Sequence, residues 1–285
     1  MKQTQNIPII NITPVKGWVP LNIKELWDNR ELLYFFVWRD IKVRYKQTLL
    51  GVAWTILVPL ANTIVFTLLF GKLANLPTDN LPKPVFYMTG LVIWRYFATS
   101  LNTTSNSLVG GAGLLTKIYF PRLLLPLSTC IVGLVDFTVA FTALTLLMLY
   151  FNTLPALTIL FIPLLVLITL FTALGTGLFF AALNVKYRDV SSLVPFFIQL
   201  WMYCSVIVPF SMLPEKFGAL RYLYGINPLT GIIEGFRWCL LHHVPETTIH
   251  PPWILITIGS IVALTMLFSG LYYFKRMENQ FADIV

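Results

Sequence analysis

The sequence predicts an all-α protein that crosses a membrane several times. Hydrophobic residues make up 57% of its 285 residues, charged residues only 11%, and the mean hydropathy is +0.76. This balance is far from that of a soluble domain. In addition, six apolar runs are each long enough to cross a hydrocarbon layer of about 30 Å as a helix. We therefore expect a polytopic membrane protein with six transmembrane helices.

The six runs are separated by polar or proline-containing segments. They cover approximately residues 49–70, 85–101, 123–151, 154–183, 193–213 and 253–274, which together define a transmembrane domain over residues 49–274. An N-terminal segment, residues 1–48, precedes this domain, and a short tail, residues 275–285, follows it. The first thirty residues lack a short apolar core followed by a small-residue cleavage site, so we expect no cleaved signal peptide.

The basic residues predict the orientation of the chain. Fourteen of the twenty Lys and Arg residues fall in the N-terminal segment, in the loops after the second and fourth runs, and in the tail, whereas five fall on the other side. Cytoplasmic segments carry such an excess. We therefore expect both termini in the cytoplasm of a bacterium, with the protein in the inner membrane. Because orientation accounts for the net charge of +8, the charge does not indicate nucleic acid as a partner.

Residues 31–48 predict an amphipathic helix that lies at the membrane interface. At 100° per residue, its aromatic and aliphatic side chains gather on one face and its basic side chains beside it. Such a helix anchors and orients the protein. Clustered basic residues at headgroup depth also attract a diphosphate on a lipid. The candidates for that second role are Arg39, Lys42, Arg44 and Lys46.

The loop between the second and third runs contains the stretch SNSLVGGAGLLTKIYFPR, residues 105–122. Three glycines loosen the backbone before residue 114, and Pro121 stops a helix, which leaves about two turns over residues 114–120. A helix there would expose Leu114, Leu115, Ile118 and Tyr119 outside the bilayer. Exposed apolar surfaces commonly bind a partner. The alternative is a connector that rests on the lipid headgroups.

A second short loop on the same side, NVKYRDVSS at residues 184–192, combines charged with apolar residues. Its charges fit the orientation rule, and Tyr187 with Val190 gives it a partly apolar face.

The segment 214–252 differs in kind from the other loops. Its apolar groups are too short to span a membrane, and prolines and glycines interrupt them. We expect a pair of short helices that dip into the membrane and pack on protein or line a wet cavity. His242, His243 and His250 lie near Glu246, but they have no recognised ligand spacing, so we expect no metal site. The three cysteines also show no metal-binding spacing and are interpreted as packing residues.

Two ionisable residues, Arg95 and Asp136, fall inside the second and third runs. An isolated charge at that depth costs a few kcal/mol. We therefore expect them to pair with each other, or else to face an aqueous lumen.

Several stretches together resemble the ABC-2 type permease subunits that export lipid-linked polysaccharides, in particular the O-antigen exporters. The matching stretches read RELLYFFVWRDIKVRYKQTLLGVAWTILVPL, LLTKIYFPRLLLPL, GLVDF, ALNVKYRDVSSLVPFFIQLWMY and NPLTGIIEGFRW. With the six-run layout, they cover almost the whole chain. The chain departs from the family at Arg95, where an uncharged residue is usual, and at Val208-Pro209, where an aromatic residue often precedes the proline.

The resemblance implies a homodimer whose two protomers enclose the pathway, with a separate ATPase subunit bound beneath each protomer. ATP and Mg²⁺ would bind to that subunit, and this chain would carry no cofactor. The cargo would be an undecaprenyl-diphosphate-linked glycan. The implied ATPase-coupling residues are Leu114, Leu115, Lys117, Ile118, Tyr119, Tyr187, Arg188 and Asp189. The implied external gate includes Asn227, Pro228, Glu234, Arg237 and Trp238.

Independently of the resemblance, the sequence contains no G-x-x-x-x-G-K-[ST] phosphate-binding loop, so the chain has no recognisable P-loop site for ATP hydrolysis. Three alternatives remain open. In the first alternative, the cargo of the permease is teichoic acid or capsule. In the second, it is a small lipid or drug. In the third alternative, the protein is an intramembrane enzyme that acts on polyprenyl phosphates. An enzyme needs titratable groups that converge on one bond, whereas the histidines and the basic helix are expected on opposite sides.

Overall fold

The computed structural model describes residues 23–46, 51–115, 117, 119–155, 157–207, 210–213, 215–245, 247, 249–278 and 281. Among these residues every regular element is a helix, and none is a strand. This result confirms the all-α class. The predicted N-terminal segment before residue 23 and the last four residues of the tail lie outside the described residues.

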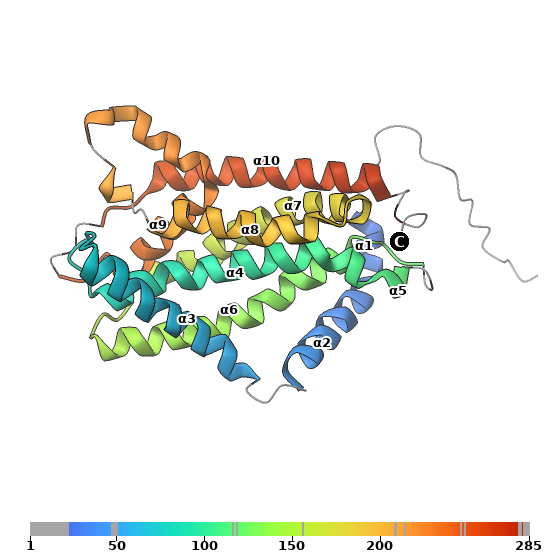
Figure 1. The fold of residues 1–285 in the computed structure, drawn as a ribbon, viewed down its shortest axis with the longest axis horizontal. Coiled ribbons are helices and arrows are strands. Elements are labelled where there is room, and N and C mark those ends of the chain that lie inside the picture. The colour runs from blue at the N-terminus through green and yellow to red at the C-terminus, as the bar shows by residue number, and fades with distance from the viewer. Residues whose placement is uncertain are drawn as a thin grey trace, which may run out of the picture.

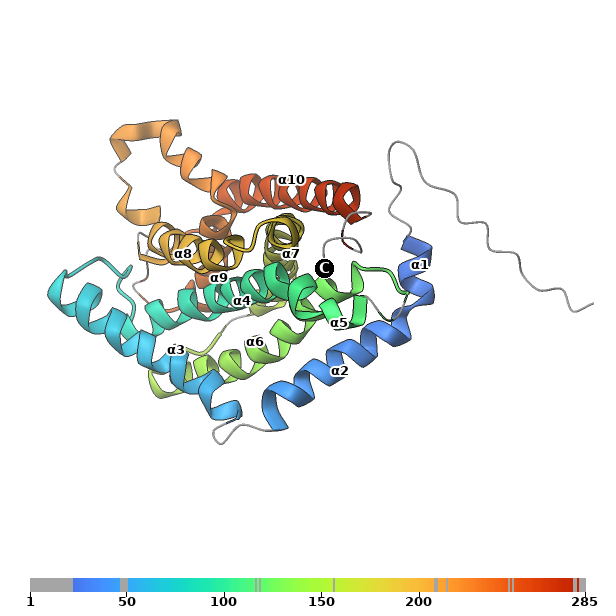
Figure 2. The ribbon, with the colours of Figure 1, turned by 45° about the vertical axis from the view of Figure 1, so that its right-hand side comes forward.

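Three helices lie outside the main bundle: two are short and one is long. Helix α1 covers Ile23–Asp28 and α2 covers Arg30–Lys46, close to the predicted interfacial helix, while the four-residue α5 covers Ala112–Leu115. Figure 2 shows α2 lying obliquely beside the bundle, with α6 as its neighbour. Its exposed face carries Tyr34, Phe35, Trp38 and Val43, as expected for a helix that rests in an interface.

The long helices run side by side and make up the body of the molecule (Figure 1). They are α3 (Val52–Phe66), α4 (Lys83–Gly110), α6 (Leu124–Tyr150), α7 (Ile162–Lys186), α8 (Val190–Met202) and α10 (Trp253–Met277). Shorter helical pieces extend three of them: η1 (Thr67–Leu73) after α3, η2 (Leu157–Phe161) before α7 and η3 (Tyr203–Ile207) after α8. A shorter piece, η4 (Phe210–Met212), then leads to η5 (Glu215–Ile226) and α9 (Pro228–Leu241).

Within the described part of the chain, five helices are long and apolar enough to cross a membrane. They correspond to the predicted first, third, fourth, fifth and sixth spans and cover Ala53–Leu73, Leu124–Tyr150, Leu157–Lys186, Val190–Ile207 and Trp253–Met277. The predicted second span lies within α4, which has 28 residues but is not among the five. The reason is its second half, ATSLNTTSNS, which is rich in hydroxyl and amide side chains.

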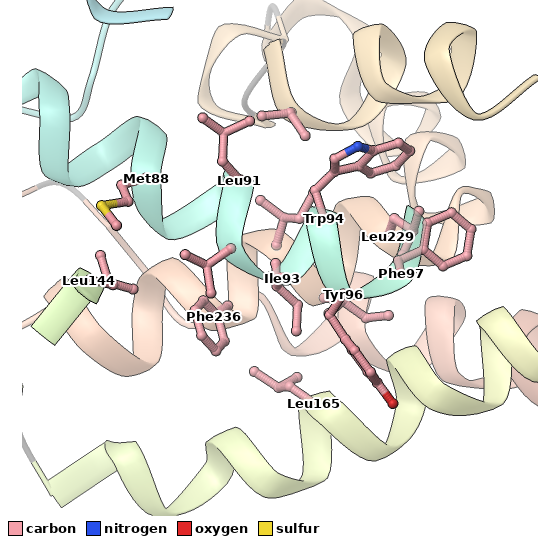
Figure 3. Packing of buried hydrophobic residues seen from close by; sticks show 14 of the residues in the cluster. Met88, Leu91, Ile93, Trp94, Tyr96, Phe97, Leu144, Leu165, Leu229 and Phe236 are labelled. Carbon is pink, nitrogen blue, oxygen red and sulfur yellow. The ribbon is translucent and has the colours of Figure 1, made fainter. Parts of the chain in front are cut away.

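Helix α4 lies at the centre of the bundle and contributes more residues to the main buried cluster than any other helix does. It contacts α3, α6, α7, α8 and α9, and seventeen of its residues are buried. Figure 3 shows its side chains packing against residues from three other helices, namely Leu144 of α6, Leu165 of α7, and Leu229 and Phe236 of α9. Two sets of polar contacts join α4 to its neighbours: Thr104 bonds to Thr129 of α6, and Asn184 of α7 donates to the Ser105 carbonyl and to Asn106.

Close contacts between small residues hold α7 and α10 together. The two helices approach so closely that a Cβ atom on Gly175 would lie 2.5 Å from the backbone nitrogen of Leu267. A Cβ atom on Gly270 would in turn fall on the carbonyl of Gly175. Small residues at such crossings allow helix backbones to touch, which is how helices associate where lipid gives no hydrophobic driving force.

The predicted basic loops lie together at one end of the bundle, which we call the basic end. It contains α1, α5, and the C-terminal ends of α7 and α10, and its residues include Lys117, Arg122, Lys186, Arg188, Lys275 and Arg276 (Figure 1). The first described helix and the last thus meet at the same end. The other end, which we call the opposite end, contains η5 and the start of α10.

Candidate functional sites

The loop after α4 exposes less apolar surface than its sequence predicts. The expected two-turn helix over residues 114–120 is wrong: the helix spans only Ala112–Leu115. Leu114 and Leu115 are half-buried, because both pack against the cluster that Phe36 of α2 forms with Leu124 and Leu125. Lys117 is exposed and Tyr119 is 93% exposed, whereas Ile118 lies outside the described residues. The free apolar contact in this loop is therefore Tyr119.

The second basic loop is exposed over residues 186–189, whereas Val190, predicted to share its apolar face with Tyr187, is buried. Tyr187 is 54% exposed, and Arg188 and Asp189 beside it are also exposed. The loop is held near the first one by Asn184, whose side-chain nitrogen donates to the Ser105 carbonyl at 3.1 Å and to the Asn106 side-chain oxygen at 3.0 Å. These bonds fix the end of α7 to the end of α4. The structure thus brings the two predicted coupling loops to one end of the molecule.

The carboxylate of Asp136 binds two side chains of α2. Arg44 forms a salt bridge with one carboxylate oxygen, and the Tyr45 hydroxyl donates to the other. The expected ion pair between Arg95 and Asp136 is therefore wrong, because Arg44 takes the place of Arg95 in it. Arg95 still interacts electrostatically with Asp136 and Arg44, but within the described part of the chain no carboxylate lies within salt-bridge distance of it.

Burial raises the pKa of Tyr45, and its hydrogen bond to Asp136 raises the pKa further. The hydroxyl therefore stays protonated at neutral pH and remains a donor. Sequence analysis missed this partnership because it grouped the aromatic side chains of residues 31–48, Tyr45 among them, on one face of an interfacial helix and sought no polar partner for them. The signal available was its position directly beside Arg44.

A groove lies between α2, α4 and α6 and is lined by hydroxyl groups and charges. It consists of two adjoining hollows of about 320 and about 260 Å³ that share Asp40 and Thr129. Arg39 lines one hollow and Arg44 the other. Arg39 is paired with Asp40 at 2.7 Å, so the groove contains cations together with one carboxylate. The remaining polar lining consists of Thr103, Ser107 and Ser128.

The two lysines of α2 are placed differently from the arginines. Lys42 is exposed, and its Nζ lies 4.2 Å from the centroid of the Trp38 ring. Lys46 is exposed at the end of the helix. Neither lines the groove. The four basic residues that sequence analysis grouped together therefore divide into two that face the groove and two at the exposed surface.

Helix α9 is held in the bundle by a polar network at its N-terminal end. Asn227 caps its N-terminus by accepting from the Leu229 amide, accepts from the Trp201 indole at 2.8 Å and donates to the Ser205 hydroxyl at 2.8 Å. These bonds join α9 to the end of α8. Pro228 follows at the first helical position, where its missing amide proton costs nothing. Trp201 and Ser205 were missed by sequence analysis because their partners lie more than twenty residues away.

The side chain of Arg237 is completely buried. It pairs with Glu234 at 3.1 Å, donates to the Val206 carbonyl at 3.3 Å and has its guanidinium carbon 3.9 Å from the centroid of the Phe86 ring. Trp238, the next residue, is buried against His242 and Trp253. The proposed gate residues thus form the core contacts of a nearly fully buried helix, which agrees with the expected packing of this segment on protein.

A pocket of about 550 Å³ opens at the opposite end, between η5, α9 and the start of α10. Its lining includes Asp79, Arg221, Tyr222, Glu234 and Trp253. His250 also lines it, but no three His, Cys, Asp or Glu side chains among the described residues lie close enough to hold a metal ion. Glu246, named with the histidines in the sequence analysis, lies outside those residues.

A bundle of long apolar helices, with exposed basic loops at one end and a short buried helix at the other, defines a multi-pass membrane protein. Residues 31–241 match the family described as ABC-2 type transporter. Because the match covers well over half of the chain, the protein belongs to this family.

Three curated relatives are similar over nearly their whole length. The O-antigen export system permease protein RfbA of Myxococcus xanthus is 27% identical, over 92% of this chain and 98% of the relative. The protein of the same name from Klebsiella pneumoniae is 28% identical, over 90% and 95%. The polysialic acid transport protein KpsM of Escherichia coli is 23% identical, over 85% and 91%.

Proposed function

We propose that the protein is the membrane subunit of an ATP-driven exporter that moves a polysaccharide linked to a lipid diphosphate outward across the bacterial inner membrane. The observation that carries this proposal is the likeness to two O-antigen export permeases along almost the whole chain. Membership of the ABC-2 family adds that the chain works as the permease part of a transporter. Hydrolysis of ATP, with its Mg²⁺, takes place on a separate subunit.

The topology of the proposal has six spans, with α4 as the sixth crossing helix. At about 1.5 Å per residue its 28 residues reach about 42 Å, more than a hydrocarbon layer needs. With six crossings both termini lie on one side, and the basic end faces the cytoplasm by the positive-inside rule. Two copies of the chain enclose the pathway as a homodimer.

The ATPase docks on the two loops of the basic end. Tyr119 and Tyr187 supply exposed aromatic contacts, and Lys117, Arg188 and Asp189 supply charges around them. Aromatic residues surrounded by charges are typical of interfaces. Leu114 and Leu115 act from below by fixing the loop to α2, because they are packed into the protein.

The diphosphate of the lipid carrier enters at the groove beside α2. Arg39 and Arg44 line this groove, and guanidinium groups bind phosphate with paired hydrogen bonds. Asp40 pairs with Arg39 when no lipid is present, and the diphosphate of the lipid replaces Asp40 as the partner of Arg39. Lys42 and Lys46 attract the anionic membrane surface around the groove. At the opposite end, η5 and α9 form the gate.

The experiment is reconstitution in vesicles together with the ATPase subunit that co-purifies from native membranes. The measurement is the transfer of a lipid-linked glycan across the bilayer, with and without ATP. We expect transfer only when both ATP and the ATPase are present. Transfer at the full rate by this chain alone, without ATP, contradicts the proposal.

Export of a capsule-like polymer is the second candidate, and the likeness to the polysialic acid transport protein favours it. The two candidates differ in cargo only, so the same vesicles separate them. Transfer of a capsular glycan in preference to an O-antigen glycan selects the second.

A further inference from the structure

Phe281, beyond the last helix, is buried at the basic end of the bundle. Helix α10 ends at Met277, and Phe281 beyond it is only 1% exposed. The ring of Phe281 meets the ring of Phe274 with 5.2 Å between centroids. Phe281 belongs to a cluster of buried residues drawn from α4, α7 and the loop before α6, against which Leu115 of α5 also packs.

Arg122, at the end of the first coupling loop, holds this tail at two points. Its guanidinium donates to the backbone carbonyl of Glu278, and its central carbon lies 5.9 Å from the centroid of the Phe281 ring. The last carbonyls of a helix have no partner within the helix, and a cation near them is favourable. Lys275 adds a salt bridge to Glu278 at 2.7 Å. The loop is therefore joined directly to the end of α10.

The far end of α10 is joined equally closely to α9. A Cβ atom on Gly259 would lie 3.1 Å from the Pro228 carbonyl oxygen, and one on Gly231 would fall on the backbone of Leu255. Backbones in such contact move together, because no flexible side chain lies between them. One unbroken helix of 25 residues thus reaches from the basic end to the first turn of α9.

We propose that Arg122 and Phe281 are positioning residues that fasten the coupling loop to α10, so that a displacement of the loop by the ATPase reaches α9 through α10. The inference rests on the proposed function, in which the ATPase docks on that loop. Without this fastening, the ATPase still binds and hydrolyses ATP, but the gate at the opposite end responds weakly. The readout that separates positioning from a structural role is therefore glycan moved per ATP hydrolysed.

The main variant is Phe281→Ala, measured in vesicles that hold the complex with the ATPase. We expect unchanged co-purification of the ATPase, an unchanged rate of ATP hydrolysis and about tenfold less glycan moved per ATP, which corresponds to about 1.4 kcal/mol. Phe268→Ala is the control, since it removes the same kind of ring at a site on α10 that is 63% exposed. Phe281→Leu keeps an apolar side chain and is expected to restore most of the coupling. Arg122→Gln is expected to act like Phe281→Ala.

The response of α9 itself is read from a cysteine placed at the half-buried His242, beyond its C-terminal end. The background carries Cys204→Ser, because Cys204 is the exposed native thiol in the described part of the chain. We expect the reaction of this cysteine with an external thiol reagent to change on adding ATP, and this change to vanish in Phe281→Ala but not in Phe268→Ala.

Two outcomes overturn the inference while leaving the proposed function intact. One is equal coupling in wild type and Phe281→Ala. The other is that both Phe281→Ala and Phe281→Leu lose ATPase binding as well as coupling. That result would mean that the contact is needed only for folding. Failure of the wild-type chain to bind any ATPase contradicts the proposed function, and this inference with it.

Discussion

Neutralising Asp136 is expected to release α2 from the bundle. The change Asp136→Asn removes the charge that holds Arg44 and weakens the bond from Tyr45. The side chain of Asp136 is 15% exposed and that of Arg44 is 31% exposed. Removing one partner of a buried pair costs about 3–5 kcal/mol, while exposed pairs contribute about 0–1 kcal/mol. For this intermediate burial we expect a loss of about 2 kcal/mol, or about 30-fold in the docking equilibrium of α2.

Hydrogen exchange of the α2 backbone amides measures this docking directly. In Asp136→Asn we expect exchange over residues 30–46 to rise by about the same factor, while α4 and α7 stay protected. The control is Asp40→Asn, which removes a carboxylate that bonds to Arg39 within α2 itself. Adding Arg44→Gln to Asp136→Asn should bring little further loss, since both changes break one interaction. Equal exchange in the Asp136 and Asp40 variants refutes the assignment.

Three further predictions concern other parts of the molecule. Tyr119→Ser should weaken ATPase binding, measured by co-purification, without lowering the melting temperature. Leu115→Asp should lower both ATPase binding and the melting temperature, because Leu115 is packed into the protein. Gly270→Val should cost more than about 3 kcal/mol by forcing α7 and α10 apart, measured by thermal aggregation in detergent, while Gly113→Ala, with open space around it, should be nearly neutral. Arg237→Ala should destabilise the protein by about 3–5 kcal/mol in denaturant titration, because it leaves the carboxylate of Glu234 without its cation. Both Gly270→Val and Arg237→Ala should still insert into the membrane.

Hydropathy predicted the helices well because each apolar run has only one way to satisfy its backbone in lipid, which is to form a helix. The bounds of the third and sixth runs differ from those of α6 and α10 by at most three residues. The second run was too short, since α4 continues to Gly110 through polar sequence. That extension depends on neighbours: the side chains of Thr104 and Asn106 are tolerated because Thr129 and Asn184 bond to them. A single sequence gives no sign of such partners.

The candidate sites were predicted less completely, because their partners are distant in sequence. Arg95 and Asp136 were paired as neighbours in the helix order, yet α2 supplies a cation that lies ninety-two residues before Asp136. The helix α5 stopped early because Leu115 gains more by packing on α2 than by continuing a helix into the exposed loop. Composition located the loops correctly. It gave no information about which of their side chains remain free.

The polar residues inside the bundle indicate which parts can move during transport. Where helices meet lipid on their other faces, apolar contact gives them little reason to associate, so hydrogen bonds and close packing must hold them. Helix α4 is held to α7 through Asn184 and to α6 through Thr104, and α9 is held to the end of α8 through Asn227. Motion within this central group would break buried polar contacts at a cost of about 1–3 kcal/mol each. The remaining surface elements discussed above are α2 and η5. Displacing α2, at the proposed entry of the lipid, breaks the contacts of Asp136 with Arg44 and Tyr45, at the cost of about 2 kcal/mol given above. At the proposed exit of the glycan, α9 and η5 can move without breaking the Asn227 contacts when the end of α8 moves with them.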